Sequence, residues 1–425
     1  MKTVSRMIAV CFITLVMCSR VFAAQLFDLN LTVNASDSMS RSYSNVSDMF
    51  NGLTQEQISA SIPTYTSTSP LNAKLNFRGL PITVTAVAGS ASMKLEIPAL
   101  GVNQTFSGTT RDDSQTQLED WFKKNGGDTI NKLMKKLAET TATDPIAGNP
   151  NSAMAQSVAT DFTRGFLNTA TSLRETNAAS APATSGTTLP ESNANTISLA
   201  ARFGSLSQGG SNSQSFTLPL AYTVRFQDPL ESLSVSMPVT MVDIEGSKSY
   251  SIGLGVGYSF PISKSWVITP SVGYTATGSA DMASAGQILS GSLTSSYSLP
   301  ISSYQLSMGN MAGYYRTLPL DIGEYSFDPK IENYVVRNGL MLYIPTEFLF
   351  KETGLEVFGI DTRYMGDALF IDSYDEFGIS FGRTRVERKN LGDMVKNILT
   401  DIRLGVTYIT AKATSGFTVN LGYSF

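Results

Sequence analysis

The chain has 425 residues and a formal net charge of −4, from 31 Lys and Arg against 35 Asp and Glu. It contains no His and only two Cys, Cys11 and Cys18, so the commonest general base and metal ligand are missing. The excess of acids argues against a nucleic-acid partner. Ser and Asp are plentiful, but without His or Cys they form no recognisable nucleophile–base pair, and a Ser–Lys pair is the one alternative left open. We therefore expect no enzyme, no metal site and no cofactor.

Residues 1–23 have the pattern of a secretory signal peptide. Lys2 and Arg6 precede an apolar run over 7–18, and small residues at 21–23 form a cleavage site. The apolar run is too short for a helix that spans a bilayer. Both cysteines lie inside this segment, so the exported chain has no disulfide.

Residues 24–176 predict a small α+β region. Alternating apolar residues indicate a strand over 27–33, and the Ser-, Thr- and Asn-rich stretch 35–72 is typical of a loop. Two further strands are predicted over 73–88 and 92–102, joined at Gly89.

The hydrophobic period then changes to that of helices. One helix is predicted to begin near Asp113, to break at Gly126–Gly127 and to resume over 130–137. A second helix, 152–167, carries apolar residues four apart on one face. It either packs against the local sheet or lies inside a barrel. Residues 177–195 have the composition of a linker.

Residues 196–425 predict a transmembrane antiparallel β-barrel. Apolar residues alternate with Gly, Ser, Thr and Ala, which suits a wall with lipid on one side and a polar lumen on the other. Glycines at 253, 255 and 257 favour tight curvature of that wall. Twelve strands are expected, near 196–203, 216–226, 233–241, 250–260, 266–274, 286–299, 303–315, 333–347, 354–365, 373–385, 399–411 and 416–425.

Connector lengths give a predicted orientation. If the amino end of the barrel is periplasmic, every second connector is a short periplasmic turn. The connectors 227–230, 261–265 and 300–302 belong to that set, whereas 204–214 and 277–285 are predicted to be longer surface loops.

The last ten residues alternate strictly and end on an aromatic residue. The apolar row is Phe417, Val419, Leu421, Tyr423 and Phe425. This stretch resembles the closing strand of Gram-negative outer-membrane β-barrels, in which such a row is the signal read by the barrel-assembly machinery. The resemblance implies an outer-membrane location, with that machinery, outer-membrane lipids and lipopolysaccharide as partners.

Three functions remain open. The first is a channel for small solutes, in which charges expected on the inward side select by charge; the alternative is that these charges only brace the wall. The second is an autotransporter, which the order of signal, soluble region, helix, linker and barrel resembles, although 24–176 is short for a passenger. The third is a structural envelope protein. The inward charge candidates are Arg225, Asp361, Arg363, Arg383 and Arg385.

Overall fold

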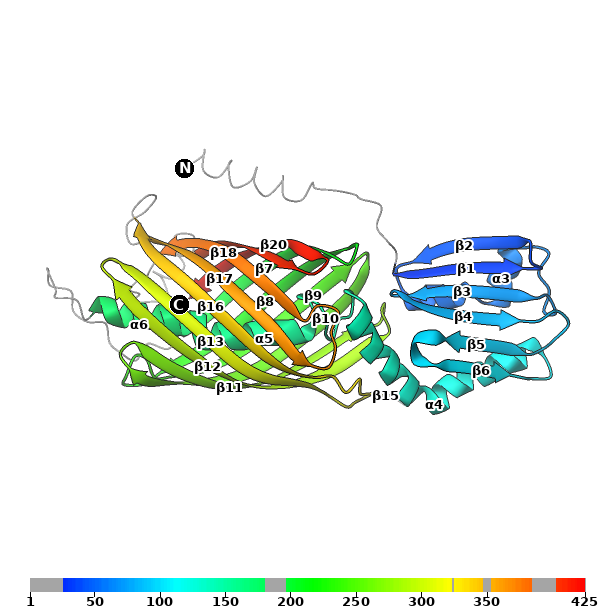
Figure 1. Cartoon of the computed structure of the whole chain (residues 1–425), viewed down its shortest axis with the longest axis horizontal. Helices are drawn as coiled ribbons and strands as arrows, with labels where there is room; N and C mark the ends of the chain where they lie inside the picture. The colour runs from blue at the N-terminus through cyan, green and yellow to red at the C-terminus, as the bar shows by residue number, and fades with distance from the viewer. Residues whose placement is uncertain (1–25, 180–195, 323–324, 347–352, 384–402, 425) are drawn as a thin grey trace, which may run out of the picture.

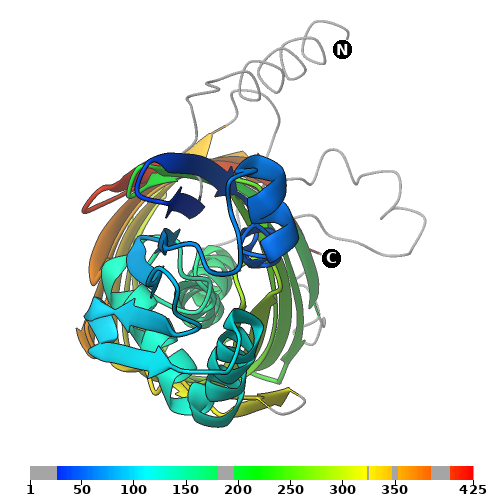
Figure 2. The same ribbon diagram turned by 90° about the vertical axis from the view of Figure 1, so that its right-hand side faces the viewer.

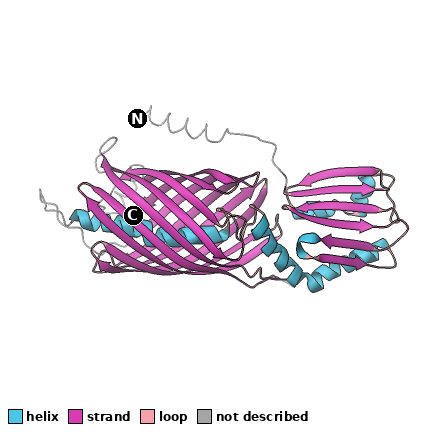
Figure 3. Ribbon diagram, in the orientation of Figure 1, coloured by secondary structure: helices cyan, strands magenta, loops and turns pink. Residues whose placement is uncertain are grey.

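A computed structural model describes residues 26–179, 196–322, 325–346, 353–383 and 403–424. It has two parts along its long axis, a small sheet domain formed by the amino-terminal region and a β-barrel (Figure 1). The helices and strands of both parts are distinguished in Figure 3. The predicted fold class, a carboxyl-terminal antiparallel barrel behind a small α+β region, is confirmed.

The amino-terminal domain is a six-stranded antiparallel sheet in the order β2-β1-β3-β4-β5-β6. Two short helices and a 3₁₀ turn accompany it. The bounds are β1 (Phe27–Val33), β2 (Asp37–Tyr43), α2 (Val46–Asn51), α3 (Gln55–Ser61), β3 (Leu71–Phe77), β4 (Leu80–Ala86), β5 (Met93–Ile97), η1 (Pro98–Leu100) and β6 (Val102–Phe106).

Two sequence predictions are wrong in this domain. The stretch 35–72, expected to be mostly loop, contains β2, α2 and α3. The strand β2 was missed because the face that carries Met39 and Tyr43 also carries Asp37 and Arg41, so its alternation is weak. The strand expected over 73–88 is a hairpin that turns at Arg78 and Gly79, both with positive φ (53° and 97°). The second expected strand likewise ends at Ile97, where Pro98 begins η1.

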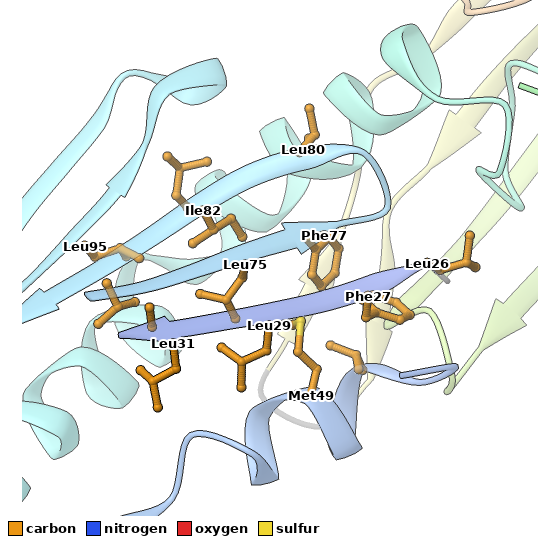
Figure 4. Packing of buried hydrophobic residues seen from close by; sticks show 14 of the residues in the cluster. Leu26, Phe27, Leu29, Leu31, Met49, Leu75, Phe77, Leu80, Ile82 and Leu95 are labelled. Carbon is orange, nitrogen blue, oxygen red and sulfur yellow. The ribbon is translucent and has the colours of Figure 1, made fainter. Parts of the chain in front are cut away.

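One face of the sheet carries the domain's core. Phe27, Leu29 and Leu31 of β1 are at most 1% exposed and pack with Met49 of α2 and Ile58 of α3 (Figure 4). Burial of such side chains contributes roughly 1.5–3 kcal/mol each. The same cluster continues into Val242, Ile244 and Met282 at the barrel end, so the core of the domain is joined to the barrel.

A single long helix, α4 (Arg111–Thr140), leads from the sheet to the barrel. Thr110 and Asp113 form a capping box at its start, and hydrogen bonds from Thr109 and Thr110 hold the pKa of Asp113 below its usual range. The predicted break at Gly126–Gly127 is wrong, because the helix continues through both glycines. Within the described residues, no helix is long and apolar enough to cross a membrane.

The barrel has twelve antiparallel strands, and β20 pairs with β7 to close it. The predicted number is confirmed. The bounds are β7 (Thr196–Gln208), β8 (Ser211–Arg225), β9 (Ser232–Ile244), β10 (Ser247–Ser263), β11 (Trp266–Ser279), β12 (Ser284–Ile301), β13 (Tyr304–Leu318), β16 (Glu332–Thr346), β17 (Thr353–Gly366), β18 (Ser373–Arg383), β19 (Arg403–Ala411) and β20 (Thr414–Ser424); a small hairpin of β14 (Leu320–Ile322) and β15 (Tyr325–Phe327) lies between β13 and β16.

The outer wall is apolar. On β10 the outward side chains Tyr250, Ile252 and Leu254 are each more than half exposed, while the residues between them are Ser and Gly that face inward. A similar alternation runs through most of the other strands, β17 being an exception, as expected for a wall whose outside contacts lipid.

The two ends of the barrel differ in what they carry. At the domain end, the backbone N–H of Val46 donates to the carbonyl of Asp281 at 2.8 Å, so the β11–β12 turn contacts the sheet domain. At the terminal end, β7 begins and β20 ends, since Ser198 pairs with Ser424. Connector length separates the ends only in part. The connectors over 319–331 and 367–372 at the domain end are long, but the connector expected to be long at 204–214 is a tight turn at Gly209 and Gly210.

Candidate functional site: a helix in the barrel lumen

A helical rod runs through the barrel. It consists of α5 (Ala153–Phe162), a π-helical turn (Thr163–Leu167) and α6 (Asn168–Ala179). Viewed from the domain end, the barrel wall surrounds a helix (Figure 2). Val158, Phe162 and Phe166 are at most 1% exposed and pack with wall residues such as Met311 and Ile360. The interpretation that this segment packs against the local sheet is therefore wrong, and the lumen interpretation is right.

The barrel wall has glycines at the positions where large side chains of the helix contact it. A Cβ on Gly309 would lie 2.4 Å from Cγ of Phe166, and one on Gly339 would lie 2.8 Å from Cζ of Phe162. A Cβ on Gly255 would lie 2.0 Å from Nη2 of Arg164. Contacts below 3 Å are not tolerated in close-packed interiors. These glycines therefore fit the wall to this particular helix, which is a further role beside the curvature expected from the sequence.

The first of three polar contacts lies at the π-helical turn. Arg164 pairs with Asp161 at 2.9 Å, and both side chains are 3% exposed. Arg164 also donates to Ser236 on β9 at 2.6 Å. Asp161 accepts from Tyr315 at 2.9 Å and from Ser290 at 3.1 Å. One ion pair of the helix is thus bound to three strands of the wall.

The second contact is made by the wall around Phe162. Arg337 on β16 pairs with Glu376 on β18 and donates to Thr362 at 2.5 Å. Its guanidinium lies over the Phe162 ring, 5.1 Å from the centroid. A buried guanidinium over an aromatic face is a favourable arrangement, worth about 2 kcal/mol when desolvated.

The third contact lies near the terminal end of the lumen. Arg174 of α6 pairs with Glu356 of β17 at 2.9 Å, and Arg403 of β19 pairs with the other carboxylate oxygen. Ser380 donates to Glu356 at 2.8 Å. The Arg174 guanidinium also lies 4.3 Å from the centre of the Tyr343 ring.

These buried ion pairs fix the position of the helix more than they add stability. Desolvation of two charges offsets much of their attraction, whereas removal of one partner leaves a costly unpaired charge. A helix that slid or rotated in the lumen would break the contacts of Asp161, Arg164 and Arg174 with the wall together. The contacts therefore define one register of the helix in the barrel.

One cavity lies between α5 and the wall. It is lined by Gln156, Arg202 and Glu376 among others and has a volume of about 20 Å³. A site of that size holds about one water molecule. This cavity therefore has no room for a solute.

The sheet domain contacts the domain end of the barrel. Arg78 pairs with Asp144 at 2.8 Å, with both side chains fully buried, between the β3–β4 turn and the segment that leads into α5. Lys135 of α4 pairs with Asp367 of the β17–β18 loop at 2.7 Å. The domain is thus attached to the barrel mouth by direct contacts.

The structure corrects the predicted lumen charges. Arg225 is inward, at the terminal end of β8. Asp361 and Arg363 are outward, because Thr362 between them is buried and hydrogen-bonded to the inward Arg337. They pair with each other at 3.0 Å. Arg383 is the last residue of β18, and Arg385 lies outside the described residues.

The inward charges that the structure does show were missed from the sequence. They are Asp161, Arg164, Arg174, Arg202, Arg337, Glu356, Glu376 and Arg403. On β17 the inward residues Phe358 and Ile360 are as apolar as the outward Val357, because they pack near the helix. Alternation is lost there, and with it the signal that would have placed Glu356 inward.

The closing strand has the predicted alternation. Phe417 is outward and 54% exposed, and Val419 and Leu421 follow on the same row. Tyr423 lies within β20, and Phe425 lies outside the described residues. Their role as an assembly signal stays a prediction.

No family model and no curated protein matches the chain. The solved structures that it resembles include the β domain of the Bordetella autotransporter BrkA, with 9% identity, a TM-score of 0.40, and coverage of 55% of this chain and 99% of that one. The translocator domain of the Neisseria meningitidis autotransporter NalP has 12% identity, a TM-score of 0.42, and coverage of 64% and 99%. An outer-membrane channel from Pseudomonas putida F1 has 11% identity, a TM-score of 0.37, and coverage of 57% and 98%. At these identities the likeness concerns the fold alone.

Proposed function

We propose that this protein is an outer-membrane barrel that holds its own amino-terminal domain at the cell surface, in the manner of an autotransporter. The observation that carries the proposal is the path of the chain. The domain contacts one end of the barrel, the helix crosses the lumen, and the barrel strands begin at the opposite end.

The orientation follows from the resemblance of the closing strand. In that family the first and last strands of the barrel begin and end on the periplasmic side. This places the terminal end of the barrel in the periplasm and the domain end at the cell surface. The exposed apolar wall supports insertion into a bilayer, because only a closed barrel or a helix satisfies every backbone group in lipid. The protein then has no catalytic role, and its partners are the lipids and the assembly machinery.

The test is residue labelling on intact cells, since the exported chain has no cysteine of its own. Val87, 70% exposed on the sheet domain, and Lys264, in the β10–β11 turn at the terminal end, are each replaced by Cys. A membrane-impermeant maleimide is expected to label Val87→Cys in intact cells and Lys264→Cys only after lysis. The reverse pattern would place the domain in the periplasm.

The second candidate function is a solute channel, which requires the helix to leave the barrel lumen. Inward polar rows of Ser and Thr on β10 to β12 line the lumen and would suit water once the helix had gone. Steady conductance from the wild-type protein in planar bilayers would favour this function over surface display.

A further inference from the structure

Six polar side chains gather on the outer wall at the domain end, where the apolar surface of β17 to β19 stops. We call this set the polar patch, and it consists of Asp361, Arg363, Ser373, Asp375, Thr410 and Lys412. They line an open hollow of about 290 Å³. Other strands also carry outward charges near this end, for example Asp243 on β9 opposite Lys248 on β10; the polar patch combines such charges with this hollow.

The strand register arranges the patch in two rows. In the row farther from the membrane centre, Arg363 pairs with Ser373, and Lys412 follows in the β19–β20 turn. In the next row, Asp361 of β17 lies opposite Asp375 of β18 in the strand register, and Asp375 lies opposite Thr410 of β19. Cations thus lie at the rim, with carboxylates and a hydroxyl just below them.

Apolar side chains continue the same columns toward the membrane centre. Gly359, Phe377 and Tyr408 form the next row, and Val357, Ile379 and Val406 the one after. Phe377 is 57% exposed and Ile379 48%. Phe377 lies beside Gly359, where an added Cβ would be 3.6 Å from its ring. Toward the membrane centre the columns therefore change from charged to aromatic to aliphatic side chains. This order matches a lipid whose charged headgroup lies at the rim and whose acyl chains point toward the membrane centre.

The patch retains free hydrogen-bonding capacity. Arg363 uses Nε and Nη2 on Asp361, which leaves three of its five N–H donors, and its side chain is 65% exposed. Asp375 forms no ion pair with another described residue, and it lies directly opposite the like-charged Asp361. Adjacent carboxylates on one face of a sheet repel each other, so a ligand with hydrogen-bond donors would relieve that repulsion.

We propose that the polar patch binds the headgroup of a phosphorylated, hydroxyl-rich lipid, with the acyl chains along Phe377 and Ile379. Arg363 and Lys412 bind the phosphate, since charge-assisted hydrogen bonds to phosphate are strong. Asp361, Asp375 and Thr410 accept hydrogen bonds from the hydroxyl groups. The site rests on the proposed membrane location, but not on which side the sheet domain occupies.

The test is titration of the purified full-length protein in detergent, followed by native mass spectrometry. Three probes separate head from tail: short-chain phosphatidylglycerol, short-chain phosphatidylcholine and glycerol 3-phosphate. Phosphatidylglycerol is expected to bind best, because phosphatidylcholine lacks hydroxyl donors and glycerol 3-phosphate lacks chains. Arg363→Gln with Lys412→Gln is expected to weaken phosphatidylglycerol binding about tenfold or more, through the loss of two charged contacts.

Controls keep the outcome interpretable. Lys248→Gln removes a cation from the domain end of β10 and is expected to change nothing; Arg363→Lys keeps the charge and is expected to retain most of the affinity. Folding is checked by gel mobility before and after boiling, and the single variants replace the double one if it does not fold. Equal binding by the double variant, or equal binding of all three probes, would overturn the site. Neither result bears on the labelling test of surface display.

Discussion

Arg164 pairs with Asp161 on its own helix and joins the helix to the wall through Ser236 on β9. Its alkyl stem lies where Gly257 has no side chain, since a Cβ there would be 2.5 Å from its Cδ. The residue therefore depends on a wall glycine, a wall hydroxyl and a helical acid at once. Such a site tolerates little change in either charge or shape.

Arg164→Met is expected to unseat the helix locally, because it leaves Asp161 buried and unpaired at a cost of about 3–5 kcal/mol. The measurement is the temperature at which the folded band on a gel converts to the unfolded one. Lys136→Met is the matched control: Lys136 and Glu139 have the same i,i+3 spacing on a helix but are exposed, so its effect should be within about 1 kcal/mol.

Addition of Asp161→Asn to Arg164→Met separates charge from packing. It removes the unpaired charge but keeps an oxygen to accept from Tyr315 and Ser290. The double variant is expected to be more stable than Arg164→Met alone. If it is equally unstable, the loss comes from packing rather than from the buried charge.

At the scale of elements, the helix and the wall have complementary shapes. Gly309→Ala places a methyl group 2.4 Å from Phe166, and the β13 backbone cannot move without breaking its pairing with β12 and β16. The helix is held less firmly than the β13 backbone, so it is expected to be displaced from its position in the lumen. Conductance in planar bilayers should then appear where the wild-type barrel is silent.

Two variants check that expectation. Phe166→Ala in the Gly309→Ala background makes room again and is expected to reduce the conductance. Gly291→Ala, also on a barrel strand, has nothing within 4 Å of the added methyl group and is expected to be silent. A silent Gly309→Ala barrel would show that the helix adapts rather than leaves.

Whether the sequence predicted a strand or an inward charge depended on what packs against it in the folded protein. The strands β8 to β13 were predicted because one face contacts lipid and the other is small and polar, so alternation is strong. The edge strand β2 is mostly polar and gave a weak signal. The hairpin at Arg78 was predicted as one strand, because apolar residues alternate on both sides of its turn. Lumen charges such as Glu356 could not be predicted, because the helix that buries them comes from a distant part of the chain.

At the scale of the whole molecule, closure depends on the last strand, since β20 alone joins β19 to β7. A closed barrel has no edge at which to unzip, so it resists detergent until heated. The native protein in cold detergent is therefore expected to migrate differently from boiled protein. Recovery of the exported chain as a soluble periplasmic protein would contradict the barrel's membrane location.

Deletion of Phe425 is expected to affect assembly in cells more than the stability of the finished barrel. One interfacial aromatic contributes on the order of 1.5–3 kcal/mol, which is small beside twelve paired strands, but it also ends the row proposed as the assembly signal. The heat-modifiable fraction should fall sharply in cells and little after refolding from urea into detergent. Equal losses in both would make Phe425 a packing residue only.

The occupied lumen also constrains the order in which the molecule can form. A helix about 10–12 Å across fills the barrel, whereas a sheet of six strands about 4.8 Å apart spans roughly 24 Å before its helices are added. The folded domain cannot pass through that lumen. Display at the surface therefore requires the domain to cross as unfolded chain, or the wall to close only after it has crossed. A chain without disulfides in its exported part suits either route, because no covalent bond can lock the domain too early. The yield of displayed protein would then depend on how slowly the domain folds before crossing, rather than on how stable it is afterwards.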